Sequence, residues 1–279
     1  MELTCFKVEI EHNIAHVILN RPDKRNAMNA DFWRELPAII HDIDDQSRAR
    51  VIVISSTGPH FSAGLDLSMF GQADAESGPE LNKNQRAVAS YHHILHMQKT
   101  FNCLEACRLP VIAAVQGGAI GGGVDLSTAC DIRYATKDAF FTIQEINIGL
   151  TADVGTFPRL VKLLPEGVVR EMAYTGRAMP ASEAQQVGLV NRVFDDQQAM
   201  LEGVMGVAAE IAAKAPVAIY GSKRMINYAR DHSTEDALDY ISIWNTSMMN
   251  SGEIQEAIAA RKEQRSGSFV DLPPKRRMS

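Results

Sequence analysis

Three acidic residues lie in otherwise apolar sequence and could transfer protons. Asp125 follows a run of glycines, Glu145 ends the segment 140–145, and Asp153 lies within 149–155. A carboxyl group in apolar surroundings needs a partner or has a raised pKa, and a raised pKa suits proton transfer near neutral pH. An acid in a loop can equally cap a helix, so the spacing alone leaves a catalytic and a structural role open.

The glycine-rich segment 117–123 directly precedes Asp125. Five of its seven residues are glycine, and it lies between a predicted strand at 111–115 and a helix-compatible stretch at 124–130. Glycine lets backbone approach a ligand closely, and a helix beginning there would point free N–H groups at that ligand. The segment therefore predicts a site for an anion or a developing oxyanion, although a tight strand-to-helix turn would use the same glycines. The Lys-Ser/Thr pair of a nucleotide P-loop is missing.

Alternating strands and helices must position these groups. Short β-branched segments at 14–19, 51–54 and 111–115 predict buried strands, and apolar residues at helical spacing predict a helix over 29–45. This alternation indicates an α/β layer structure. A turn at 59–67, after the second strand, could supply another exposed N–H group. Beyond residue 180 the predicted elements are mainly helices, at 196–214, 216–230, 234–250 and 253–265.

The composition favours a small-molecule site. The chain has 279 residues, a formal net charge of −6 and a sequence pI near 5.8, so it has no general field that attracts nucleic acid or an anionic membrane. Four cysteines are too few for a disulfide scaffold, and no basic apolar leader, long apolar run or terminal Ser-Lys-Leu is present. These features predict a cytoplasmic protein that binds neither nucleic acid nor membrane.

A cluster of metal-type ligands lies in the predicted helix around 86–107. His92, His93 and His96, with Cys103 and Cys107, have helical spacing compatible with metal ligation. No fourth-ligand pattern completes a zinc motif, so we predict no metal and expect this helix to line a pocket or an oligomer contact.

Three segments in order, 61–67, 119–126 and 129–134, strongly resemble the crotonase (enoyl-CoA hydratase/isomerase) superfamily, and the resemblance covers about residues 6 to 265. Within the superfamily, the chain looks most like the dienoyl-CoA isomerases, on the segments 130–134, 138–141, 149–156 and 221–223.

The resemblance implies an α/β crotonase (ClpP-like) fold with a repeated β-β-α spiral core. We expect this core, with the coenzyme A and acyl site, over 1–195, a C-terminal helical trimerisation region over 196–268, and a flexible tail over 269–279. The usual assembly of the family predicts a homotrimer or a dimer of trimers. The expected ligand is an acyl-CoA substrate, with no cofactor beyond its coenzyme A moiety.

The resemblance also assigns the reacting groups. It implies an oxyanion hole made by the backbone N–H groups of Leu65 and Gly122, and catalytic acids at Asp125, Glu145 and Asp153. Hydratases of the family carry Glu at the first two acid positions and usually Gly near the third. The shorter first acid and the additional third one predict conversion of a 3,5-dienoyl-CoA to a 2,4-dienoyl-CoA in unsaturated fatty acid β-oxidation.

In this reaction one carboxyl group removes a proton from carbon 2 and another returns a proton at carbon 6. We expect Glu145 to act as the base and Asp153 as the acid, with Asp125 orienting its neighbours; the opposite assignment of base and acid is open. An enoyl-CoA hydratase and a non-catalytic crotonase-like RNA-binding protein are the alternatives. The family's substrate contacts correspond to Arg25, Ala27, Ala63, Gly64, Leu65, Asp66, Leu67, Ser68 and Gly123.

Overall fold

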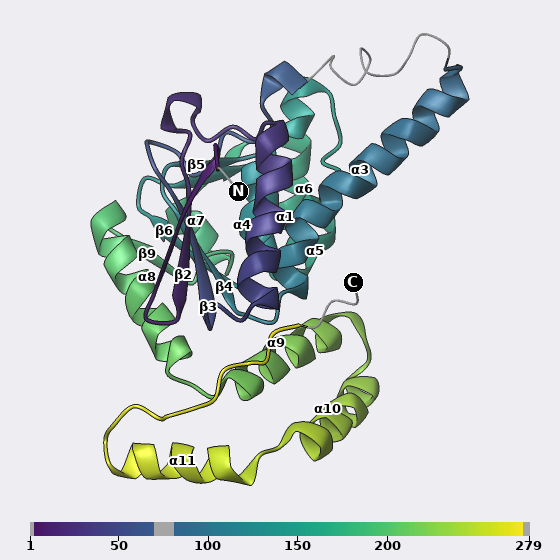
Figure 1. Ribbon diagram of the computed structural model, residues 1–279. Coiled ribbons are helices and arrows are strands. Elements are labelled where there is room, and N and C mark those ends of the chain that lie inside the picture. The colour runs from purple at the N-terminus through teal and green to yellow at the C-terminus, as the bar shows by residue number, and fades with distance from the viewer. Residues whose placement is uncertain (1–2, 70–80, 276–279) are drawn as a thin grey trace.

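The computed structural model describes residues 3–69 and 81–275 and shows an α/β core above a group of C-terminal helices (Figure 1). The polar segment 68–84, which separates the predicted strand at 51–54 from the predicted helix around 86–107 and is expected to be a long loop, lies mostly outside the described residues.

The larger sheet of the core has six strands in the order β1-β2-β3-β4-β6-β9. The first pair is antiparallel and the other neighbours are parallel. Every residue of β3 is buried because helices cover both faces of the sheet, as parallel strands require. The strands are β1 (Phe6–Glu11), β2 (Ile14–Leu19), β3 (Val51–Ser56), β4 (Val111–Val115), β6 (Ile132–Thr136) and β9 (Arg192–Phe194).

A second sheet of three short strands lies beside the glycine-rich segment. Its order is β5-β7-β8, with β5 parallel to β7 and β7 antiparallel to β8. The strands are β5 (Gly118–Ile120), β7 (Phe140–Thr142) and β8 (Ala178–Pro180). The glycines thus belong partly to a strand, and the acid-bearing segment that follows β7 is placed next to them.

The helix predicted at 29–45 is α1 (Ala30–Asp45), and Asn29 caps it by accepting from the Phe32 N–H. Helix α3 (Lys83–Ala106) packs its C-terminal half against α1, whereas its N-terminal half projects from the core (Figure 1). The other helices of the core are α4 (Gly122–Ala129), α5 (Thr156–Leu163), α6 (Glu166–Thr175) and α7 (Ala181–Gln186), and short 3-10 turns cover Pro22–Lys24, Leu67–Met69 and Glu145–Ile148.

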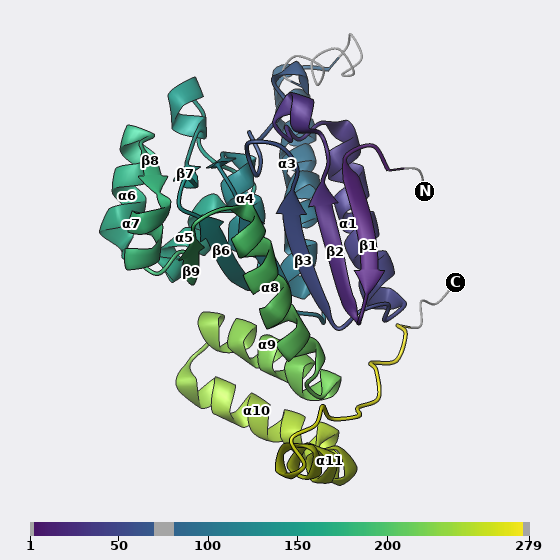
Figure 2. The ribbon, with the colours of Figure 1, turned by 90° about the vertical axis from the view of Figure 1, so that its left-hand side faces the viewer.

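Helix α8 (Gln197–Ala212) belongs to the core layer. Met200, Val204 and Ala208 on this helix are buried against β3 and β4, and Figure 2 shows α8 lying across that face of the sheet. The separate helical region therefore begins near residue 216 rather than at 196, with α9 (Pro216–Asp231), α10 (Thr234–Met248) and α11 (Ser251–Lys262). Among the described residues, no single helix is long and apolar enough to span a membrane; α8 and α9 reach that length only as a pair bent by 108°.

The segment expected as a flexible tail is bound to the core over its described part, 269–275. Arg50 donates to the Phe269 carbonyl at 2.8 Å, and Arg108 donates to the Pro273 carbonyl at 2.7 Å. Leu272 is buried, and the Lys275 amine pairs with Asp44. Lys275 and the Pro273 carbonyl are thus among the groups that hold the described part of this segment in place.

Candidate active site

A cavity of about 740 Å³ lies between α3, the turn after β3, the start of α4 and the segment after β7. Apolar side chains form much of its wall, and the acidic residues Asp66, Glu145 and Asp153 are among those that line it. It is lined by Lys24, Ala27, Trp33, Ala63, Gly64, Leu65, Asp66, Leu67, Met69, His93, Ile94, Met97, Ile120, Gly121, Gly122, Gln144, Glu145, Ile148, Leu150, Thr151, Asp153 and Val154.

Two backbone N–H groups, those of Leu65 and Gly122, lie at this cavity and donate no hydrogen bond to any described residue. Gly122 is the first residue of α4, so its N–H has no partner within the helix and carries part of the positive end of the helix dipole. The arrangement can hold an oxygen atom on which negative charge develops.

Glycine at position 64 permits this approach. Its φ is +78°, and a Cβ placed on it would lie 2.6 Å from the Ile120 carbonyl oxygen and 3.1 Å from the Gly122 nitrogen. Ser62 stabilises the turn, because its hydroxyl accepts from the Gly64 N–H at 3.1 Å and donates to the Asn26 carbonyl at 2.8 Å. Any larger residue at 64 would push the two N–H groups apart.

Glu145 faces the cavity beside Gly121, where an added Cβ would lie 2.9 Å from its Oε1. Its Oε2 is buried and has no hydrogen-bond partner among the described residues. Burial raises the pKa of this carboxyl group, and the nearby charge of Asp153 raises it further. A carboxylate that is poorly solvated and unpaired is a stronger base than one in water.

Asp153 lies in the loop after Gly149 and also lines the cavity. Its backbone carbonyl accepts from Gln98 Nε2 at 2.7 Å, which ties the loop to α3. Burial raises the pKa of Asp153, while backbone hydrogen bonding and the charge of His93 act in the opposite direction. The cavity thus contains two carboxyl groups with raised pKa values.

Asp125 is placed differently from the other two predicted acids. It is 0% exposed, is not among the cavity-lining residues, and accepts from the Thr156 hydroxyl at 2.8 Å. Its second oxygen, Oδ2, has no partner among the described residues. Burial raises its pKa to about 7, and the charge of Glu145 adds to this shift while Thr156 opposes it. Asp125 therefore influences the site through Glu145 rather than by contact with a ligand.

The predicted substrate contacts divide into two groups. Ala27 and the whole run 63–67 line the cavity, whereas Arg25, Ser68 and Gly123 do not. Lys24, which is not one of these predicted substrate contacts, provides a cation at the cavity.

The residues that sequence reasoning missed are mainly apolar, and several come from α3. His93 and Met97 lie one helical turn apart and both line the cavity, so helical spacing was the signal that could have found Met97. No group of three or more potential metal ligands gathers anywhere in 3–69 or 81–275. All four cysteines are buried as free thiols.

Comparisons with known proteins agree with this geometry. A family model described as enoyl-CoA hydratase/isomerase matches residues 9–272. A Mus musculus protein named mitochondrial Delta(3,5)-Delta(2,4)-dienoyl-CoA isomerase is 46% identical, with 91% of this chain and 78% of that protein covered. An Arabidopsis thaliana protein of the same name, peroxisomal, is 36% identical, with 97% of each chain covered.

Among solved structures, that of a probable enoyl-CoA hydratase/isomerase from Mycobacterium abscessus is 30% identical with a TM-score of 0.85, covering 96% of this chain and 99% of that one. The predicted crotonase fold is confirmed.

The predicted cytoplasmic location is contradicted. The similar isomerases from Mus musculus and Arabidopsis thaliana are named as mitochondrial and peroxisomal proteins. The prediction rested on the small number of cysteines and on the absence of recognisable targeting patterns, and the names of these relatives overturn it.

Proposed function

The chain belongs to the enoyl-CoA hydratase/isomerase family, and from this premise we propose that it isomerises 3,5-dienoyl-CoA thioesters to 2,4-dienoyl-CoA thioesters. The observation that carries the proposal is the pair of carboxyl groups, Glu145 and Asp153, facing one cavity beside two backbone N–H groups that donate to no described residue. The names of the similar proteins from Mus musculus and Arabidopsis thaliana support the same reaction.

The reaction needs a stabilised enolate. The thioester oxygen accepts hydrogen bonds from the N–H groups of Leu65 and Gly122 as charge develops on it, and one such donor is typically worth about 3–4 kcal/mol. Glu145 removes a proton from carbon 2, and the electron pair spreads over the conjugated chain to carbon 6. Asp153 gives a proton to carbon 6, which leaves double bonds at carbons 2 and 4.

This cycle leaves Glu145 protonated and Asp153 ionised, so a net proton transfer from Glu145 to Asp153, directly or through solvent, must restore both groups before the next turnover. The raised pKa of Asp153 favours its protonated form, and this neutral form lowers the electrostatic cost of ionising Glu145. Atoms and electrons balance within the substrate and the two carboxyl groups. The reaction therefore requires no cofactor beyond the coenzyme A moiety of the substrate.

Coenzyme A brings phosphates to the mouth of the cavity. Lys24 lines that cavity and is the cation best placed to pair with them, while the backbone of Gly64, Leu65 and Asp66 borders the path of the pantetheine arm. The apolar wall that includes Trp33 and Met97 suits a hydrocarbon chain.

Assays with two substrates distinguish isomerisation from hydration. With 3,5-octadienoyl-CoA the purified protein should produce a rise in conjugated-diene absorbance, whereas crotonyl-CoA should be hydrated slowly or not at all. Asp153→Asn should abolish the diene signal while acyl-CoA binding, measured by calorimetry, is retained. Rapid hydration of crotonyl-CoA with no diene product would assign the chain to the hydratases instead.

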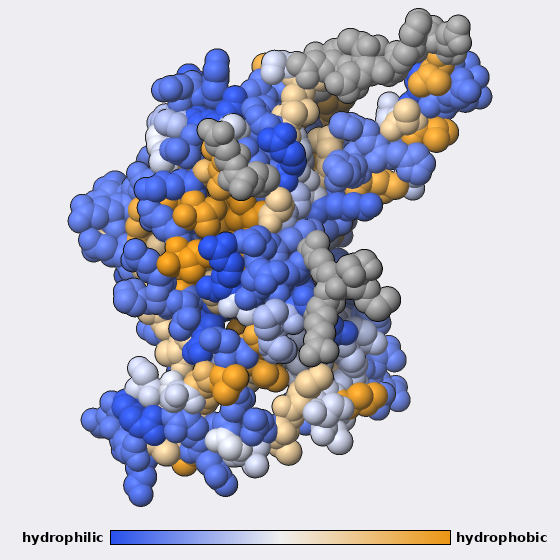
Figure 3. Space-filling model, in the orientation of Figure 1, coloured by the Kyte–Doolittle hydropathy of each residue, from blue (hydrophilic) through white to orange (hydrophobic). Residues whose placement is uncertain are grey.

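We also infer that the protein assembles through its C-terminal helices, as a homotrimer or a dimer of trimers. Helix α10 buries none of its residues within the described chain, and Leu238, Ile243 and Met249 are exposed on or just after it. Figure 3 shows further apolar side chains at the surface between the core and the C-terminal helices. Sedimentation equilibrium of the full chain tests this proposal, and a monomer at micromolar concentration would refute it.

A further inference from the structure

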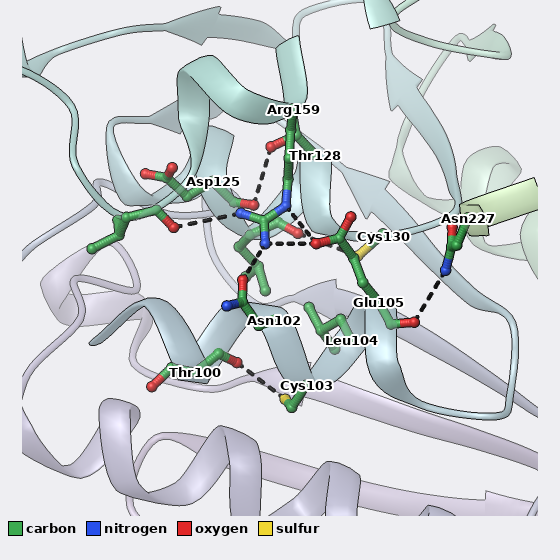
Figure 4. A network of polar contacts seen from close by, with 12 residues as sticks. Thr100, Asn102, Cys103, Leu104, Glu105, Asp125, Thr128, Cys130, Arg159 and Asn227 are labelled. Atoms are coloured by element: carbon green, nitrogen blue, oxygen red, sulfur yellow. Dashed lines mark hydrogen bonds and ion pairs between the residues drawn. The ribbon is translucent and has the colours of Figure 1, made fainter. Parts of the chain in front are cut away.

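Arg159 is a buried cation next to the loop that carries Asp153 (Figure 4). It is 7% exposed, and its Nε and Nη2 donate to Glu105 Oε2 at 3.0 and 2.8 Å. Nη2 also donates to Asn102 Oδ1 at 2.6 Å. A cation this deeply buried needs a carboxylate and further hydrogen bonds to offset the loss of hydration. Because both partners belong to α3, the guanidinium is fixed relative to that helix.

The other side of the guanidinium faces the backbone that follows Asp153. Nη1 donates to the Val154 carbonyl at 3.4 Å, and a Cβ placed on Gly155 would lie only 1.7 Å from Nη1. Gly155 has a φ of +137°, a conformation in which glycine avoids the strain of a side chain. Val154 and Gly155, the two residues after Asp153, therefore pack directly against the Arg159 guanidinium.

Helix α3 holds the same loop at a second point. Gln98 Nε2 donates to the Asp153 carbonyl at 2.7 Å. Gln98, Asn102 and Glu105 are spaced at helical intervals, so they lie on one face of α3. The same helix contributes His93 and Met97 to the cavity wall.

We propose that Arg159 is a positioning residue for the isomerisation: it clamps the 149–155 loop to α3 and so sets where Asp153 stands across the cavity from Glu145. The inference rests on the proposed function, in which these acids serve carbon 6 and carbon 2. Arg159 does not line the cavity, so it acts through the loop. A planar guanidinium can bond to Glu105, Asn102 and Val154 at once, which a lysine amine on a flexible stem cannot reproduce.

Glu105 supplies a matched control. Its other oxygen, Oε1, accepts from Arg230 Nη1 on α9 at 2.9 Å. Arg230 is 34% exposed and makes no hydrogen bond or ion pair with the 149–155 loop within the described chain. Replacing Arg230 removes a contact of similar length to the same carboxylate but leaves the loop side of the clamp intact.

The experiment compares Arg159→Gln, Arg159→Lys and Arg230→Gln with the natural protein. Arg159→Gln should speed amide hydrogen exchange in 149–155 and lower kcat about 100-fold, the scale of a misplacement near 1 Å. The KM for 3,5-octadienoyl-CoA and the exchange of its carbon-2 proton with solvent deuterium should change little, because Leu65, Gly122 and Glu145 are untouched. Arg159→Lys should recover part of the turnover, and Arg230→Gln should retain it.

Unchanged amide exchange in 149–155 on Arg159→Gln would overturn the proposal, whatever the activity. An equal loss of carbon-2 exchange and turnover would also overturn it, because the damage would then extend to the Glu145 side. Should Arg159→Gln fail to fold, Arg159→Lys is judged by the same two readouts. If the natural protein did not isomerise the substrate, the proposed function would fall, while the amide exchange would still decide whether Arg159 holds the loop.

Discussion

Replacing Asp125 by asparagine should change how the stability of the protein depends on pH. Burial raises the pKa of Asp125 from its ordinary value of 3.8 to about 7, against the hydrogen bond from Thr156 and with the help of the Glu145 charge. Between these two values the folded protein binds this proton more tightly than the unfolded chain does. The free energy of unfolding contributed by Asp125 must therefore fall as pH rises through this window.

The size of the effect follows from the pKa shift. One pKa unit corresponds to about 1.4 kcal/mol. The loss of folding stability caused by ionising Asp125 should therefore grow by roughly 3 kcal/mol as pH rises from 5 to 7, and level off above pH 7. Asp125→Asn has no such proton. Its amide keeps an acceptor for the Thr156 hydroxyl but places an NH₂ group where Oδ2 has no partner among the described residues. That adds a cost of about 1–3 kcal/mol that does not depend on pH.

Urea unfolding at a fixed protein concentration, repeated at pH 5, 6, 7 and 8, measures this difference. The stability of Asp125→Asn relative to the natural protein should rise by roughly 3 kcal/mol from pH 5 to pH 7. Asp195→Asn, at a carboxyl group 89% exposed, is the control for the same change of residue type at the surface. Parallel stability curves for Asp125→Asn and the natural protein would refute the reasoning.

Three further predictions concern turnover. Glu145→Gln should stop exchange of the carbon-2 proton with solvent deuterium, followed by mass spectrometry; preserved exchange would place the base elsewhere. Because Glu145 must be ionised and Asp153 protonated, kcat should rise and then fall as pH increases. Burial raises both pKa values, so the maximum of kcat should lie above the pH range in which carboxyl groups ordinarily titrate. A kcat that does not change with pH would contradict this prediction. Gly64→Ala should lower kcat about 100-fold, since its Cβ would lie 2.6 Å from the Ile120 carbonyl oxygen. The control Gly188→Ala, at a glycine with a φ of +88° and open space around it, should retain kcat. Equal losses of kcat in the two variants would exclude the steric cause.

The spacing of apolar residues in the sequence was sufficient to predict the longer strands and the first helix of the fold. The strands at 14–19, 51–54 and 111–115 and the helix capped by Asn29 lie where their apolar patterns predict. The three strands of the smaller sheet were not predicted as strands, because each has only three residues and therefore no periodicity. Their conformation comes from pairing between segments distant in sequence, which no local pattern reveals.

The acids show a related limit. All three occur in apolar sequence, yet only Glu145 and Asp153 line the cavity, while Asp125 lies behind its wall against Thr156. Asp125 is on the first turn of α4, and packing of α4 on α5 decides which way that turn faces. The type of residue therefore predicted the raised pKa of Asp125 but could not predict its separation from the ligand.

The choice between two adjacent cations depends on even finer detail. Sequence reasoning named Arg25 among the substrate contacts, but the adjacent cation Lys24 is the residue that lines the cavity. Arg25 has a φ of +50°, and its carbonyl accepts from the Ala63 N–H at 2.9 Å, so its backbone is committed to holding the turn at 63–67. Two consecutive left-handed residues, Arg25 and Asn26 with φ values of +50° and +53°, thus turn the chain directly after Lys24. The turn also holds the five consecutive residues 63–67, and all five line the cavity. Their position next to one another in the sequence was sufficient to predict this.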